Sequence, residues 1–72
     1  MDFIPEKPHR VRLGANIRQR RKAAKLSLRE FGLMTGIDYA YLSNIENGKA
    51  NATVDVLAKI ADGLGVTIKD LF

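Results

Sequence analysis

Few residues in this chain have the types or the spacing that catalysis needs. The sequence contains one histidine, His9, and no cysteine, so neither thiolate metal sites nor disulfides are predicted. His9 has no partner at catalytic or metal-ligand spacing, and neither a phosphate-cradling glycine loop nor a working pair of carboxylates is evident. We therefore predict that the chain is not an enzyme and that it uses no cofactor.

The chemistry that the sequence does offer is that of positively charged side chains. Residues 1–36 hold nine lysines and arginines against three acidic residues, whereas residues 37–72 hold three against five. Such a basic half suggests a polyanionic partner, although a solvated helix face explains the charge equally well. The basic patch from His9 to Arg12 leaves a similar choice, between a solvated tail and an arm that touches phosphate or a minor groove.

Two short helices joined by a glycine elbow organise the chain between Ser27 and Gly48. Ser27 and Glu30 have the spacing of a capping box, which marks the start of a helix. Gly36 favours a left-handed turn, and Asp38 is suited to cap a second helix. This order of signals is the sequence form of a helix-turn-helix.

Further motif residues extend this pattern in both directions. In chain order they are Leu13-Gly14, Ile17-Arg18, Leu26-Ser27, Glu30-Phe31, Gly36-Ile37, Tyr41-Leu42-Ser43, Ile45-Glu46, Gly48-Lys49, Leu57, Ile60-Ala61, Leu64-Gly65-Val66 and Asp70-Leu71. In this order they resemble the phage-repressor-like helix-turn-helix regulators of the lambda Cro and repressor type, the xenobiotic-response-element class. The resemblance implies an all-α fold: a compact five-helix, lambda-repressor-like DNA-binding domain with a central helix-turn-helix.

Capping signals and apolar spacing give the expected element boundaries. We expect a flexible lead-in over residues 1–9 and a domain over residues 10–72. Its helices are expected from residue 10 or 12 to residue 24 or 25, over 28–34, over 39–47, from the cap Thr53 to Gly63 or Gly65, and over 68–72. The expected core residues on these helices are Leu13, Ile17, Ala24, Leu42, Ile45, Leu57, Ile60, Ala61 and Leu64.

Arg21 falls on the apolar face of the first helix, where an unpaired charge would be costly. In the resembled family this position pairs with a glutamate near the end of the recognition helix, which is Glu46 here. The structural ion pair Arg21–Glu46 is therefore expected. The alternative is an arginine whose stem packs on the core while its head reaches solvent.

The third helix is the recognition helix by resemblance and by position. The side chains expected to face away from its apolar side, and to read bases, are Tyr39, Ala40, Ser43 and Asn44. Asn44 can pair with N6 and N7 of adenine, although an ordinary exposed polar residue is the alternative. Phosphate contacts are expected from Arg18, Ser27, Arg29, Tyr41 and Lys49. For Tyr41, packing on the second helix is equally consistent with the sequence.

The residues and the resemblance together predict sequence-specific binding to double-stranded DNA by a transcriptional regulator, most often a repressor in this family. A protein-interaction module that reuses the fold is the alternative, because Leu28 replaces the family's usual glutamine and Asp38 lies at the DNA-facing start of the third helix. We expect a homodimer on an inverted-repeat operator, with a contact formed by Val66, Ile68, Leu71 and Phe72. Neither a membrane nor a small-molecule partner is expected, and the predicted location is cytoplasmic, at the nucleoid.

Overall fold

The computed structural model describes residues 8–72 and places them in four α-helices and one turn of 3-10 helix. The α-helices are α1 (Pro8–Ala23), α2 (Leu28–Thr35), α3 (Tyr39–Glu46) and α4 (Val54–Leu64), and the 3-10 turn is η1 (Ile68–Leu71). The predicted all-α class is confirmed for these residues. The expected fifth α-helix is instead η1, because its four residues form a single turn, the length at which 3-10 hydrogen bonding is common.

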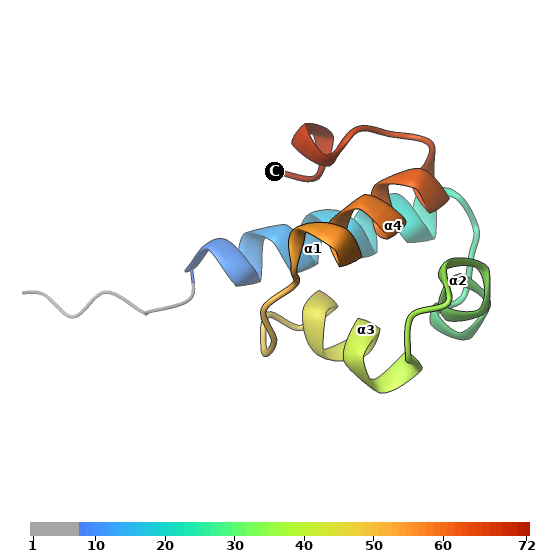
Figure 1. The fold of residues 1–72 in the computed structure, drawn as a ribbon, viewed down its shortest axis with the longest axis horizontal. Helices are drawn as coiled ribbons and strands as arrows, with labels where there is room; N and C mark the ends of the chain where they lie inside the picture. The colour runs from blue at the N-terminus through green and yellow to red at the C-terminus, as the bar shows by residue number, and fades with distance from the viewer. Residues whose placement is uncertain (1–7) are drawn as a thin grey trace, which may run out of the picture.

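The helices pack around α1, the longest of them. α1 lies alongside α4 and crosses α3, while α2 packs against α3 and α4 (Figure 1). The turn η1 folds back over α1 and α4, on the side away from α3 (Figure 1). Within residues 8–72, no helix combines the length and the apolar character that a membrane crossing requires.

The first helix starts earlier and ends earlier than the sequence suggested. Pro8 begins α1, because proline lacks the backbone N–H that a first helical position leaves unpaired anyway. Pro8 and His9 therefore belong to the helix and not to the expected lead-in, whose residues 1–7 lie outside the described residues. After Ala23 the chain turns at Lys25, which has a left-handed φ of 61°.

Capping residues define the two helices of the helix-turn-helix as predicted. The Ser27 hydroxyl accepts from the Glu30 N–H at 3.0 Å, and the Glu30 carboxylate accepts from the Ser27 N–H at 2.8 Å. α2 ends at Gly36, whose φ of 72° is a conformation that glycine adopts without a side-chain clash. The Asp38 carboxylate then begins α3 by accepting from the Tyr41 N–H at 3.2 Å.

The core contains apolar side chains from every element. They are Leu13, Ile17, Phe31, Ile37, Leu42, Ile45, Leu57, Ile60, Ala61 and Leu71. Leu64 is only half-buried, and the expectation that Ala24 lies in the core is wrong, because Ala24 follows the last residue of α1 and is exposed. The core thus joins α1 to α3 and α4, and it fixes which face of α3 is left for a partner.

Gly14 allows α1 and α3 to approach closely. A Cβ atom on Gly14 would overlap the backbone carbonyl oxygens of Ile45 and Glu46. A larger side chain would therefore have to push the C-terminal end of α3 away from α1. The glycine brings this end of α3 within reach of the arginine side chains of α1.

Candidate nucleic-acid interface

The helix α3 has one face against the core and one toward solvent. Its buried side chains are Leu42, Ile45 and Glu46. Of the four side chains expected to read bases, Tyr39, Ala40 and Asn44 are exposed and Ser43 is half-buried. A helix of eight residues is about 12 Å long, and the major groove of B-DNA is about 12 Å wide. The exposed face offers this groove an amide, a methyl group and hydroxyl groups.

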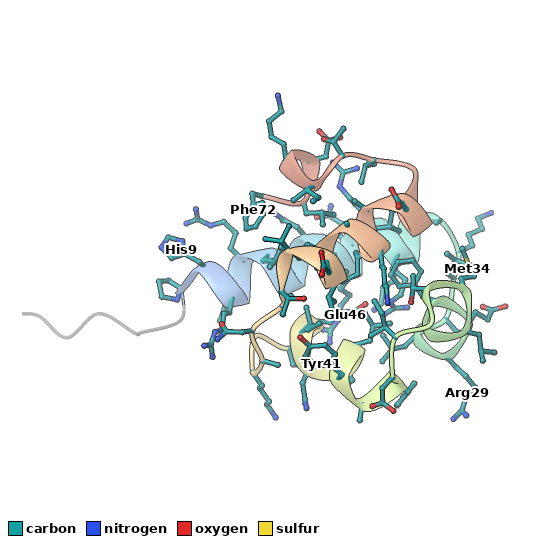
Figure 2. The ribbon with its side chains drawn as sticks, viewed as in Figure 1. His9, Arg29, Met34, Tyr41, Glu46 and Phe72 are labelled. Carbon is teal, nitrogen blue, oxygen red and sulfur yellow. The ribbon has the colours of Figure 1, made fainter. Side chains whose placement is uncertain are left out.

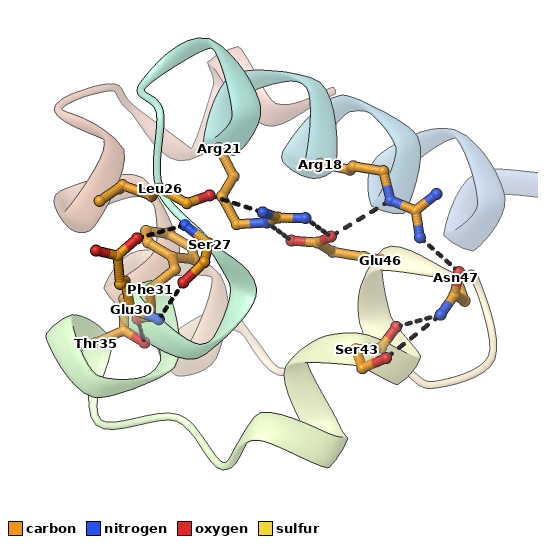
Figure 3. A network of polar contacts seen from close by, with 10 residues as sticks. All are labelled: Arg18, Arg21, Leu26, Ser27, Glu30, Phe31, Thr35, Ser43, Glu46 and Asn47. Atoms are coloured by element: carbon orange, nitrogen blue, oxygen red, sulfur yellow. Dashed lines mark hydrogen bonds and ion pairs between the residues drawn. The ribbon is translucent and has the colours of Figure 1, made fainter.

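A buried ion pair holds α3 against α1. Arg21 Nε donates to Glu46 Oε2 at 2.7 Å and Arg21 Nη2 donates to Glu46 Oε1 at 2.9 Å, and the two side chains are 9% and 1% exposed. The hydrogen bonds to Glu46 raise the pKa of Arg21, against the opposing effect of burial. Arg21 Nη1 also donates to the Leu26 carbonyl at 2.8 Å, so the pair joins α1, α3 and the segment before α2 (Figure 3). The guanidinium of Arg21 is therefore paired in the interior and does not reach into solvent.

A second arginine of α1 reaches the same carboxylate from the surface. Arg18 Nε lies 3.5 Å from Glu46 Oε1, and the Arg18 side chain is 45% exposed. Arg18 Nη2 donates to Asn47 Oδ1 at 2.7 Å. Arg18, expected to contact phosphate, is thus held at the C-terminal end of α3 with part of its guanidinium still open to solvent.

Arg29 and Lys49 are the other two basic side chains expected to contact phosphate, and both are exposed. The Arg29 guanidinium carbon lies 5.4 Å from the centre of the Tyr39 ring, a cation–π distance. Figure 2 shows Arg29 projecting from α2. Lys49 lies three residues after Glu46, the last residue of α3. Positive charge is therefore available at both ends of the exposed face of α3.

The two hydroxyl groups expected to touch phosphate are partly engaged within the protein. The Tyr41 hydroxyl donates to the Asn51 carbonyl at 2.7 Å. This bond engages the hydroxyl proton that a phosphate contact would need, and the half-buried Tyr41 side chain packs against the core. The phosphate contact of Tyr41 therefore stays a prediction. The capping box engages the Ser27 N–H and one lone pair of its hydroxyl, which leaves the hydroxyl proton for a phosphate.

Asn47 is a polar residue that the sequence marks only as the expected end of the recognition helix. Its Nδ2 donates to the Ser43 carbonyl at 3.0 Å, one turn earlier, while its Oδ1 accepts from Arg18. The motif itself gave no sign of this contact, because Arg18 lies 29 residues away along the chain.

The expected contact to a second copy is only partly at the surface. Val66 and Ile68 are half-buried, and the Phe72 side chain is exposed. Leu71 is 0% exposed, and its carbonyl accepts from Asn16 Nδ2 at 3.1 Å. Including Leu71 in the contact was therefore wrong, because η1 folds this side chain into the core.

A helix-turn-helix family and a control protein are similar to the chain over most of its length. Residues 17–71 match the helix-turn-helix family HTH_3. The control protein C.MunI of a Mycoplasma species is 39% identical over 64 residues, 88% of this chain and 86% of that protein.

Solved structures of two regulators share the fold. The restriction-modification controller protein C.AhdI of Aeromonas hydrophila superposes with a TM-score of 0.86 at 28% identity, over 89% of this chain and 97% of that one. The clp gene regulator ClgR of Corynebacterium glutamicum superposes with a TM-score of 0.85 at 31% identity, over 93% and 71% of the two chains.

Proposed function

The chain belongs to the helix-turn-helix family HTH_3, and we propose that it regulates transcription by placing α3 in the major groove of double-stranded DNA. The relatives described above are named as regulators and controller proteins and not as enzymes. The observation that carries the proposal is the exposed face of α3, which has Arg29 beside its first residue and Arg18 beside its last turn. Such an arrangement places charge on phosphates while polar side chains meet base edges.

Different side chains carry affinity and sequence preference in this proposal. Arg18, Arg29 and Lys49 neutralise phosphates, with the Ser27 hydroxyl as a further donor. Asn44 is exposed on α3 and reads adenine through its amide, whereas Ala40 meets a thymine methyl. Tyr39 and Ser43 supply hydroxyl groups to base edges.

The proposed partner arrangement is a homodimer on an inverted-repeat operator. Val66, Ile68 and Phe72 would form the contact, because the first two are only partly buried and Phe72 is exposed. They lie in and around η1, which is on the side of α1 and α4 away from α3 (Figure 1). A dimer that occupies a promoter blocks polymerase, so we propose repression, at the nucleoid. The similarity to a restriction-modification controller protein makes the promoter of such a system the first one to test.

Selection of binding sites from a random duplex pool, followed by titration in salt, tests the proposal. We expect tight binding to a selected site and weaker, strongly salt-dependent binding to random duplex. The rival function, in which the exposed face of α3 binds a protein, predicts neither result. Failure to enrich any site would therefore reject DNA reading by α3.

A pair of variants separates base reading from phosphate binding. Asn44→Ala should relax the preference at one base pair by about 1–3 kcal/mol and leave the affinity for random duplex nearly unchanged. Lys49→Ala, the matched control, should weaken selected and random duplexes alike and lower the salt slope by about one. Equal weakening of both duplexes by Asn44→Ala would contradict base reading by this residue.

A further inference from the structure

Two arginines and one glutamate meet at the crossing of α1 and α3, so this cluster carries one positive charge in excess. The buried Arg21 takes both oxygens of Glu46, at 2.7 and 2.9 Å. Arg18 reaches Glu46 Oε1 only at 3.5 Å, with its side chain 45% exposed against 1% for Glu46. Arg21 therefore largely neutralises the charge of Glu46, and the excess positive charge lies on Arg18 at the surface.

Asn47 holds this surface arginine through a neutral oxygen. Arg18 Nη2 donates to Asn47 Oδ1 at 2.7 Å. The amide cannot rotate freely, because its Nδ2 donates to the Ser43 carbonyl at 3.0 Å. Figure 3 shows the chain of contacts from Ser43 through Asn47 to Arg18 and on to Glu46. Within residues 8–72, Nη1 of Arg18 makes no hydrogen bond, so its donors are left for an external acceptor.

We infer that Asn47 is a positioning residue, which fixes the Arg18 guanidinium beside the end of α3 so that a DNA phosphate can bind it. This inference rests on the proposed DNA-binding function and adds a residue to it. An unrestrained arginine loses side-chain conformational entropy when it binds, whereas Arg18 is already ordered by Asn47 and Glu46. A carboxylate at position 47 would order Arg18 equally well and would cancel its charge. The amide orders Arg18 and leaves the charge for the phosphate.

The order of the Arg18 side chain can be measured without DNA. The NMR order parameter of the Arg18 Nε–H group should be high in the wild type, lower in Asn47→Ala and still high in Asn47→Asp. Asn44→Ala, which removes an exposed amide from the same helix, is the matched control and should leave it unchanged. An Arg18 side chain as mobile in the wild type as in Asn47→Ala would overturn the inference, whatever the protein binds.

Binding to a mixed-sequence duplex tests whether the ordered Arg18 side chain strengthens the contact with phosphate. A phosphate contact adds about 0.9 to the salt slope, equivalent to about fivefold in affinity at 0.15 M salt. We expect Arg18→Ala to lose about this much per bound copy and Asn47→Ala to lose up to the same amount. In the Arg18→Ala background, Asn47→Ala should change affinity by less than about twofold, because nothing remains for Asn47 to position.

The outcomes separate this inference from the proposed function. An equal loss from Asn47→Ala with and without Arg18 would show that Asn47 acts on DNA by itself and would overturn the positioning role. Wild-type affinity in Asn47→Asp would also overturn it, because the charge of Arg18 would then be unused. If the wild type binds duplex DNA with no dependence on salt, or not at all, the proposed function fails first. Thermal melting of each variant checks that the protein is folded during the titration.

Discussion

Glu46 is the charged residue on which the position of α3 depends. It accepts two hydrogen bonds from Arg21 in the interior, and its removal would leave the arginine uncompensated. Because an unpaired buried charge is costly, Glu46→Ala should lower the free energy of unfolding by about 3–5 kcal/mol. That is a large part of the roughly 5–15 kcal/mol that stabilises a typical domain. Urea unfolding followed by circular dichroism measures the loss.

Two control variants show whether the loss comes from burial of the unpaired charge. The double variant Arg21→Met/Glu46→Leu removes both charges at similar volume and should stay near wild-type stability. Arg18→Ala removes a half-exposed partner of the same carboxylate and should cost less than about 1 kcal/mol. A urea midpoint of Glu46→Ala close to that of the wild type would show that the domain does not depend on this pair for stability.

Two exposed carboxylates are expected to make the fold sensitive to acid. The hydrogen bond from the Ser27 backbone N–H is the largest cause that lowers the pKa of Glu30 from its ordinary value of 4.5, and the bond from the Thr67 N–H likewise lowers the pKa of Asp70 from 3.8. The unfolded state therefore binds protons more readily than the folded state. The stabilisation by these caps is complete above the ordinary values and is lost as pH falls through the lowered ones.

The melting temperature should consequently fall as the pH is lowered from about 5 to about 3. The double variant Glu30→Gln/Asp70→Asn removes both titrating caps. It should melt at a lower temperature near neutral pH and should depend less on pH over the acid range. Calorimetry at a series of pH values gives both quantities. If the wild type and the double variant show the same acid-side slope, other carboxylates cause the acid sensitivity.

At the scale of the elements, α1 and α2 are both followed by a left-handed residue, but the residue type differs. α2 ends at Gly36 with φ 72°, whereas the turn after α1 uses Lys25 with φ 61°. A left-handed conformation costs a residue with a side chain roughly 1–2 kcal/mol. Glycine avoids this cost, but its unfolded state is more flexible, which offsets part of the gain in stability. We expect Lys25→Gly to stabilise the domain by about 0.5–1 kcal/mol.

Gly36→Ala is the matched control for this comparison. Nothing lies within 4 Å of the position that its Cβ would take, so only the backbone conformation is strained. The variant should lose about 1 kcal/mol in the free energy of unfolding. Chemical denaturation of both variants tests the pair. A destabilised Lys25→Gly would mean that the lysine side chain itself stabilises the turn.

Local signals were enough to predict α2 and α3, but not the ends of α1. Ser27, Glu30, Gly36 and Asp38 act on backbone groups within four residues, so their spacing alone specifies the caps. The turn at Lys25 has no such signal, because lysine does not mark a left-handed C-cap. α1 also starts before the expected residue, since proline reads equally well as part of a linker.

Contacts between distant residues account for the features of the site that the sequence does not predict. The loop after α3 brings the Asn51 carbonyl to the Tyr41 hydroxyl, a contact that the sequence of α3 does not indicate. Leu71 was assigned to a subunit contact because its place in a short apolar turn does not show that η1 folds back onto α1. Such placements depend on the packing of whole elements, which periodicity does not specify.

At the scale of the whole molecule, the proposed DNA face and the proposed subunit contact lie apart. α3 and η1 are on different sides of the layer formed by α1 and α4 (Figure 1). A second copy can therefore cover Phe72, which is 63% exposed, while both copies of α3 stay open. Because α3 is about 12 Å long, one copy meets only three or four base pairs at about 3.4 Å each.

Three or four base pairs are too few for the specific affinities of about 10⁻⁸ to 10⁻¹¹ M that DNA regulators reach. We therefore expect two copies on an inverted repeat whose half-site centres are about 34 Å apart. Sedimentation with a selected duplex should give a two-to-one complex. Phe72→Asp should weaken it without changing the melting temperature, whereas Leu33→Asp, at a side chain 81% exposed on α2, should leave it intact. A one-to-one complex on a site without symmetry would exclude the dimer, and α3 would then need a further DNA-binding element to reach the same affinity.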